Sequence, residues 1–83
     1  MKHRHFNLIF KPEPGGGFTV VVPSLPGCVT YGENLEAAKT MAKDAITGYL
    51  ASLKKHGESI PSDDASFFST IDITTPPSRQ SYA

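Results

Sequence analysis

Residues 17–38 read GFTVVVPSLPGCVTYGENLEAA, and this stretch decides the fold. It opens with a strand pattern from Phe18 to Val22, in which alternate apolar residues share one face. The sequence Pro23-Ser24-Leu25-Pro26-Gly27 interrupts this strand, because proline lacks a backbone donor and glycine suits a turn. A short strand over Cys28–Tyr31 follows, and Asn34 is a favourable N-cap for a helix. The stretch therefore predicts two strands that lead into a helix.

The residues after Asn34 have the spacing of an amphipathic helix, which Gly57 can end in a left-handed capping conformation. Gly48 lies inside this helix and costs about 1 kcal/mol relative to alanine, which predicts close packing on the sheet or a slight bend. The residues expected to form the buried stripe are Leu35, Ala38, Ala42, Ala45, Ile46, Tyr49, Leu50 and Leu53.

Further strands are expected on either side of this unit. Residues 6–11 alternate in polarity and end at the turn-forming residues 12–17, so they predict a first strand in a hairpin. Residues 67–73 predict a fourth strand with Phe67, Ile71 and Ile73 on one face. The predicted fold is a two-layer α+β sandwich, β-β-β-α-β, with one helix covering one face of a four-stranded, mostly antiparallel sheet. We expect one domain over residues 1–74 and a flexible C-terminal tail over residues 75–83.

Composition narrows the classes of function. The 83 residues are 39% hydrophobic and 19% charged, which is typical of a small globular domain. Eight basic residues balance eight acidic ones, so the chain lacks the net positive charge of a nucleic-acid-binding domain. A single cysteine excludes an internal disulfide. No apolar run is long enough for a signal peptide or a membrane span, which makes the cytoplasm the expected location.

The order of the motifs resembles that of the HicB antitoxin family. The family has a glycine–aromatic strand start, a proline–acid–leucine–proline–glycine–cysteine turn, a glycine before the helix and a leucine–glutamate–alanine helix start. Residues 17–38 are similar to all of these, and residues 42–46 and 57–61 also fit, so the resemblance covers about residues 5–73. Two positions depart from the pattern: Ser24 replaces the usual acid, and Ala37 replaces a common second glutamate.

The resemblance implies both a fold and a partner. The fold would be a degenerate RNase H-like core, with the fourth strand beside the first. The partner would be a HicA-like toxin, a small ribonuclease that cleaves mRNA with the help of a histidine. The function implied is that of an antitoxin that binds and neutralises this toxin without a cofactor. Many relatives carry a DNA-binding segment after the fourth strand, and none is evident in this chain.

The residues themselves predict that the domain is not an enzyme. A metal-dependent RNase H site needs several converging carboxylates, but the first three predicted strands contain none and the fourth contains only Asp72. His3 and His5 have no third metal ligand nearby and are expected in a weakly ordered polar end. Cys28 lacks a histidine close in sequence and is interpreted as a small buried residue.

Two segments are candidates for binding a partner. Residues Pro23, Ser24, Leu25, Pro26 and Gly27 form a rigid loop that either presents Leu25 to a partner or folds it inward. The acidic residues Glu58, Asp63 and Asp64 either meet a basic toxin surface or are simply solvated. A homo-oligomer, dimer or tetramer, is also expected because the core is small. Two rival functions stay open: a stand-alone RNA-associated domain of degenerate RNase H type, and a structural homo-oligomer without a toxin.

Overall fold

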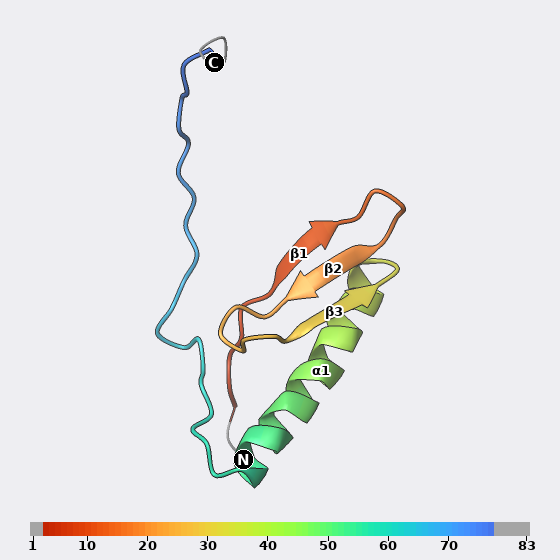
Figure 1. Cartoon of the computed structure of the whole chain (residues 1–83), viewed down its shortest axis with the longest axis vertical. Helices are drawn as coiled ribbons and strands as arrows, with labels where there is room; N and C mark the ends of the chain where they lie inside the picture. The colour runs from red at the N-terminus through yellow and green to blue at the C-terminus, as the bar shows by residue number, and fades with distance from the viewer. Residues whose placement is uncertain (1–2, 78–83) are drawn as a thin grey trace.

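The computed structural model of the chain describes residues 3–77, which form three strands followed by one helix (Figure 1). The elements are β1 (Ile9–Pro12), β2 (Phe18–Val21), β3 (Val29–Gly32) and α1 (Leu35–Lys55). The strands form an antiparallel sheet in the order β1-β2-β3, and α1 packs against β3 and β2 (Figure 1). The described chain therefore has the predicted α+β class and two layers, with β1 at an edge of the sheet.

The alternation of buried and exposed side chains predicted for the first two strands is confirmed. Phe10 lies opposite Val20 in the β1–β2 pair, and both side chains point toward the helix layer. Val20 and Val22 are buried, whereas Ile9 on the other face is exposed. Because successive side chains in a strand point to opposite faces, this register places one apolar row against α1.

The predicted ends of the helix are also confirmed. The Asn34 side-chain oxygen accepts a hydrogen bond from the amide of Ala37 at 2.8 Å, as an N-cap does. At the other end Gly57 has φ +71°, and the amide of Glu58 donates to the carbonyl of Leu53 at 2.9 Å. This is the Schellman arrangement, which satisfies carbonyl groups that the last turn of a helix leaves unpaired.

The buried stripe of the helix is narrower than predicted. Ala38 and Ala42 are fully buried against β2, and the five apolar residues from Ala45 to Leu53 pack around a second core cluster. The sequence predicts Leu35 in this stripe, but its side chain is 53% exposed. Close packing does not explain Gly48 either, since no atom lies within 4 Å of the position that a Cβ would take.

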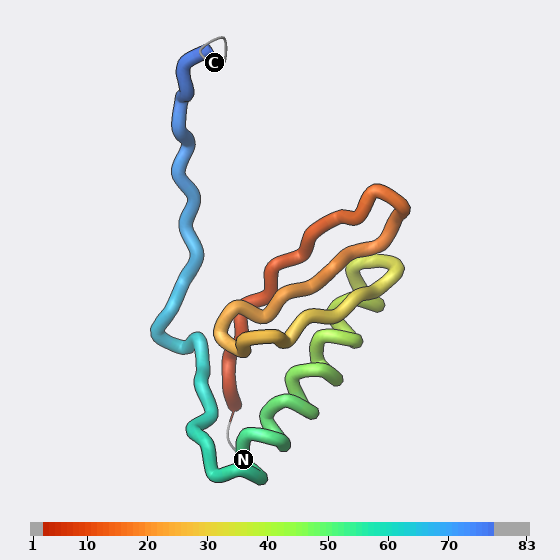
Figure 2. The backbone as a smooth tube through the Cα atoms, viewed as in Figure 1, coloured from red at the N-terminus to blue at the C-terminus, as the bar shows by residue number. Residues whose placement is uncertain are grey.

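The prediction of a fourth strand is wrong for the described chain. Residues 67–73 form no strand and run away from the sheet as an extended segment (Figure 2). The radius of gyration is 17.1 Å, whereas a compact chain of this length has about 12 Å. The amide of Ser66 donates to the carbonyl of Asp63 at 3.0 Å, and the chain leaves the body after this turn. Apolar alternation alone does not specify whether a segment pairs with a strand or which strand edge it meets.

The C-terminal tail expected over residues 75–83 lies largely outside the described residues, which end at residue 77. Residues 75–77 continue the extended segment and are exposed.

Candidate functional site

The loop Pro23–Gly27 is built from two consecutive turns. The amide of Leu25 donates to the carbonyl of Val22 at 3.0 Å, and the amide of Cys28 donates to the carbonyl of Leu25 at 2.9 Å. Gly27 has φ +81°, so the second turn has proline and a positive-φ glycine at its two central positions, as in a type II turn. A bond from the amide of Val22 to the carbonyl of Cys28 closes the loop at 3.0 Å. The loop is therefore held in one shape by its own backbone.

Leu25 points into the protein, which decides between the two alternatives for this residue. Its side chain is 1% exposed and packs with Val22 and Cys28 against the C-terminal half of α1. The hypothesis that Leu25 anchors a partner from an exposed position is therefore wrong in this structure. Pro23, Pro26 and Gly27 form the exposed part of the loop.

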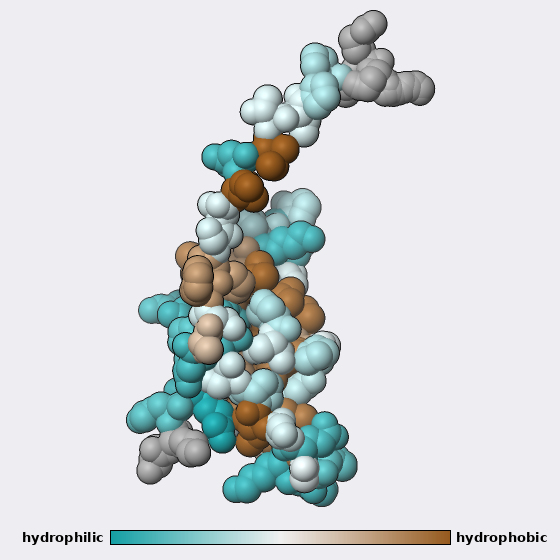
Figure 3. Space-filling view, turned by 90° about the vertical axis from the view of Figure 1, so that its left-hand side faces the viewer, coloured by the Kyte–Doolittle hydropathy of each residue, from teal (hydrophilic) through white to brown (hydrophobic). Residues whose placement is uncertain are grey.

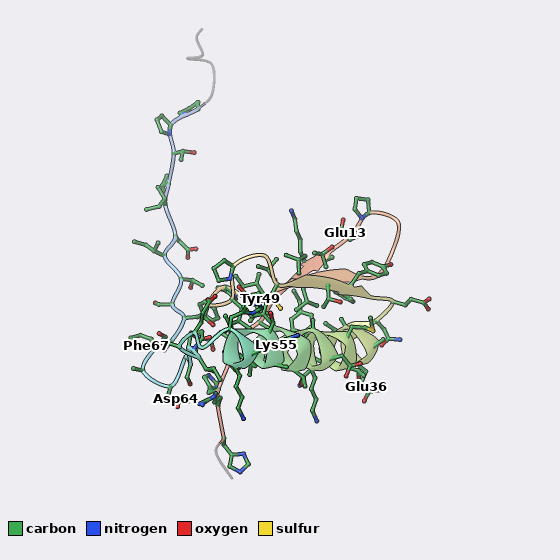
Figure 4. The ribbon with its side chains drawn as sticks, turned by 60° about the horizontal axis from the view of Figure 1, so that its bottom comes forward. Glu13, Glu36, Tyr49, Lys55, Asp64 and Phe67 are labelled. Carbon is green, nitrogen blue, oxygen red and sulfur yellow. The ribbon has the colours of Figure 1, made fainter. Side chains whose placement is uncertain are left out.

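The structure brings this loop beside the segment that follows the helix. The Tyr49 hydroxyl donates to the carbonyl of Pro26 at 2.8 Å and ties the loop to α1. A shallow hollow of about 250 Å³ lies between Pro26 and Glu58 and is also lined by Ser59 and Pro61. Two segments that the sequence singled out separately thus share one surface, at the end of α1 where Figure 4 shows Tyr49 and Asp64. Tyr49 was predicted only as a core residue, and its polar tip was the signal for this second role.

Asp63 is a structural residue and does not form part of an exposed acidic group. Its side chain is 8% exposed, and its Oδ2 accepts from the amide of Asn7 at 2.8 Å and from the Ser24 hydroxyl at 3.2 Å. The amide of Asp63 also donates to the carbonyl of His5 at 2.7 Å. One carboxylate therefore joins the N-terminal segment, the Pro23–Gly27 loop and the chain after α1. These bonds also tie down His5, which was expected in a weakly ordered end.

We expect Asp63→Ala to lower the free energy of unfolding by about 2–4 kcal/mol, because it removes a buried charged acceptor and leaves the partly buried amide of Asn7 and hydroxyl of Ser24 without their partner. The neighbouring exposed Asp64 provides the matched control, and Asp64→Ala should change stability by less than about 0.5 kcal/mol. Urea unfolding followed by circular dichroism measures both values. Equal effects of the two substitutions would contradict the assignment.

A metal site and a reactive thiol set different requirements for the remaining titratable groups of the described residues. In the range 3–77, no three histidine, cysteine, aspartate or glutamate side chains are grouped closely enough to hold a metal ion. Cys28 is buried, and this burial raises the pKa of its thiol above the ordinary value, so the thiol is neutral near pH 7. This agrees with the interpretation of Cys28 as a core residue.

A larger groove lies on another side of the molecule and was missed in the sequence. It measures about 960 Å³ and has an apolar floor made by Phe6, Leu8, Ile46 and Leu50. The N-terminal segment supplies the first two residues and α1 supplies the other two. Ile46 and Leu50 were predicted in the buried stripe of the helix, and Phe6 and Leu8 fall in the alternating residues 6–11. All four are only half-buried, and no further strand lies beside β1 in the described chain.

The described residues thus define a small two-layer α+β domain with one rigid loop and two surface hollows. No helix within residues 3–77 is long and apolar enough to cross a membrane. Residues 6–74 match the family described as the HicB-like antitoxin of a bacterial toxin–antitoxin system, and the chain belongs to this family.

Two archaeal relatives support the assignment. A UPF0150 protein of Thermoplasma acidophilum is 43% identical over 60 residues, which cover 72% of this chain and 87% of the relative. A UPF0150 protein of Archaeoglobus fulgidus is 38% identical over 53 residues, which cover 64% of this chain and 75% of the relative.

Proposed function

We propose that this chain is the antitoxin of a type II toxin–antitoxin pair, and that it binds and neutralises a HicA-like mRNA-cleaving ribonuclease in the cytoplasm. The match of residues 6–74 to the HicB-like antitoxin family carries the proposal. In this proposal the chain acts by surface complementarity, without catalysis and without a cofactor. The balanced charge of the sequence favours a protein partner over RNA.

We place the toxin-binding surface at the end of α1 that holds the Pro23–Gly27 loop. Pro23, Pro26 and Gly27 are exposed there on a loop whose shape is already set, so binding would cost little ordering entropy. Glu58 and Asp64 are exposed beside it and carry negative charge. A ribonuclease that holds RNA presents a basic surface, which these acids would attract. Leu25 and Asp63 support this surface from inside.

Co-expression tests the proposal as a whole. We expect the chain to restore growth to cells that express the toxin encoded beside it, and the two purified proteins to form a stable complex. The toxin should lose its mRNA cleavage on addition of the chain, because its RNA-binding surface would be covered. Continued cleavage at saturating antitoxin would contradict the proposal.

Association kinetics test where the toxin binds. The double variant Glu58→Gln/Asp64→Asn should lower the association rate by roughly threefold or more at low salt and weaken the salt dependence of that rate. Glu33→Gln/Glu36→Gln is the matched control, since it removes two exposed acids near the opposite end of α1, where Figure 4 shows Glu36. Stopped-flow measurements over a salt series give both rates. A larger effect of the control pair would move the binding surface to the start of the helix.

A further inference from the structure

The extended segment 67–73 is amphipathic although it contacts little of its own body. Phe67, Ile71 and Ile73 are 85%, 81% and 70% exposed. These three residues occupy odd positions, so in an extended chain they line one face together with Ser69. The other face carries Thr70, Asp72 and one apolar residue, Phe68, which is 57% exposed. Figure 3 shows brown, hydrophobic side chains along this segment where it stands away from the body. A strand-like segment with one apolar face needs a surface to cover it.

The same molecule offers an uncovered surface of matching kind. β1 is an edge strand, so one side of its backbone has no partner strand in the described sheet. The apolar groove formed by Phe6, Leu8, Ile46 and Leu50 lies beside the N-terminal entry to this strand. A strand added at this edge would place every second side chain over the groove. The apolar face of segment 67–73 has this periodicity.

Charge favours the same pairing. The groove is bordered by the exposed cationic side chains Arg4, Lys39 and Lys43. The segment carries an aspartate at position 72 and no lysine or arginine between residues 64 and 77. The segment therefore brings no positive charge that would repel the basic border of the groove.

The geometry at Asp63 sends the segment away from the groove of its own copy. Asp63 is held against His5 and Asn7, and the turn closed by Ser66 directs the following residues outward (Figures 1 and 4). A second copy presents an identical groove and an identical segment. In two copies related by a two-fold axis, the segment of each copy can therefore lie in the groove of the other. This arrangement is closed and reciprocal.

We propose that segment 67–73 of one copy binds in the groove and at the β1 edge of a second copy, so that the protein is a segment-exchanged homodimer. Phe67, Ile71 and Ile73 are the anchors. This surface is separate from the one proposed for the toxin, and its test uses the chain alone. Failure of the dimer proposal would therefore leave the toxin proposal standing.

Sedimentation of the full chain at micromolar concentrations should show a dimer. Ile71→Asp should raise the dissociation constant of this dimer by roughly 100-fold or more, because it places a charge where an apolar anchor binds. Thr70→Asp is the matched control, since it adds the same charge one residue away on the opposite face, and it should change the constant by only about twofold. A monomer of the unaltered chain, or a dimer unaffected by Ile71→Asp, would overturn the proposal.

A second measurement separates exchange between copies from folding back within one copy. Isotope-labelled and unlabelled chains are unfolded together, refolded and examined by filtered nuclear Overhauser spectroscopy. We expect contacts between the methyl groups of Ile71 and Ile73 in one copy and Phe6 or Leu8 in the other. Contacts only within one copy, or contacts that appear only after the toxin is added, would contradict the proposal. If Ile71→Asp also loses its helix, this experiment on the unaltered chain decides.

Discussion

Leu25→Asp should unfold the domain. The carboxylate would replace a side chain that is 1% exposed and packs with Val22 and Cys28 under the C-terminal half of α1. An unpaired charge in such a site, together with the lost apolar contacts, costs more than about 4 kcal/mol. The free energy of unfolding of a folded domain is about 5–15 kcal/mol, and a small domain lies near the lower end. The substitution would therefore remove most of the free energy that keeps this domain folded. Circular dichroism and the dispersion of amide resonances measure the outcome.

Leu25→Met is the control for this experiment. It keeps the volume and the apolar character of the side chain, and it should cost less than about 1.5 kcal/mol. If the aspartate variant keeps the melting temperature of the unaltered chain, Leu25 lies outside the core and its role as an exposed partner anchor must be reconsidered. If it unfolds, any loss of toxin binding in that variant reflects the fold and carries no information about the interface.

Gly32→Ala is expected to have an effect of similar size for a different reason. A Cβ at position 32 would overlap the backbone nitrogen and Cα of Ala38 and would lie 2.7 Å from the carbonyl carbon of Ala37. These are backbone atoms of the first turn of α1, so no side-chain rotation relieves the overlap. The helix would have to shift off β3, and we expect a loss of about 3 kcal/mol or more.

Gly48→Ala is the matched substitution in the same protein. It adds the same methyl group at a position with no atom within 4 Å, and it removes the helix penalty of glycine. It should therefore raise the free energy of unfolding by about 1 kcal/mol. Urea unfolding of both variants gives the comparison. A destabilising effect at Gly48 equal to that at Gly32 would show that the exposed face of α1 packs against something outside the described chain.

The amino-acid sequence by itself determined the local structure. Asn34 and Gly57 set the ends of α1 because a capping side chain and a left-handed glycine act within a few residues of their own position. The alternation from Phe18 to Val22 specified which face of the sheet is buried, since the period of a strand is a local property. The order of these motifs was also sufficient to identify the family, as the match over residues 6–74 shows.

Only the tertiary structure decided how these local elements meet. Two consecutive turns bend the Pro23–Gly27 loop so that Leu25 points inward, and no periodicity reports the direction of a single loop side chain. Asp63 looked like its neighbour Asp64 in the sequence, but hydrogen bonds to residues 56 and 39 positions away bury the first and leave the second exposed. Segment 67–73 has the pattern of a strand, yet it does not pair within the described chain. A strand forms only where a free edge is within reach, and that reach depends on contacts made far away in the sequence.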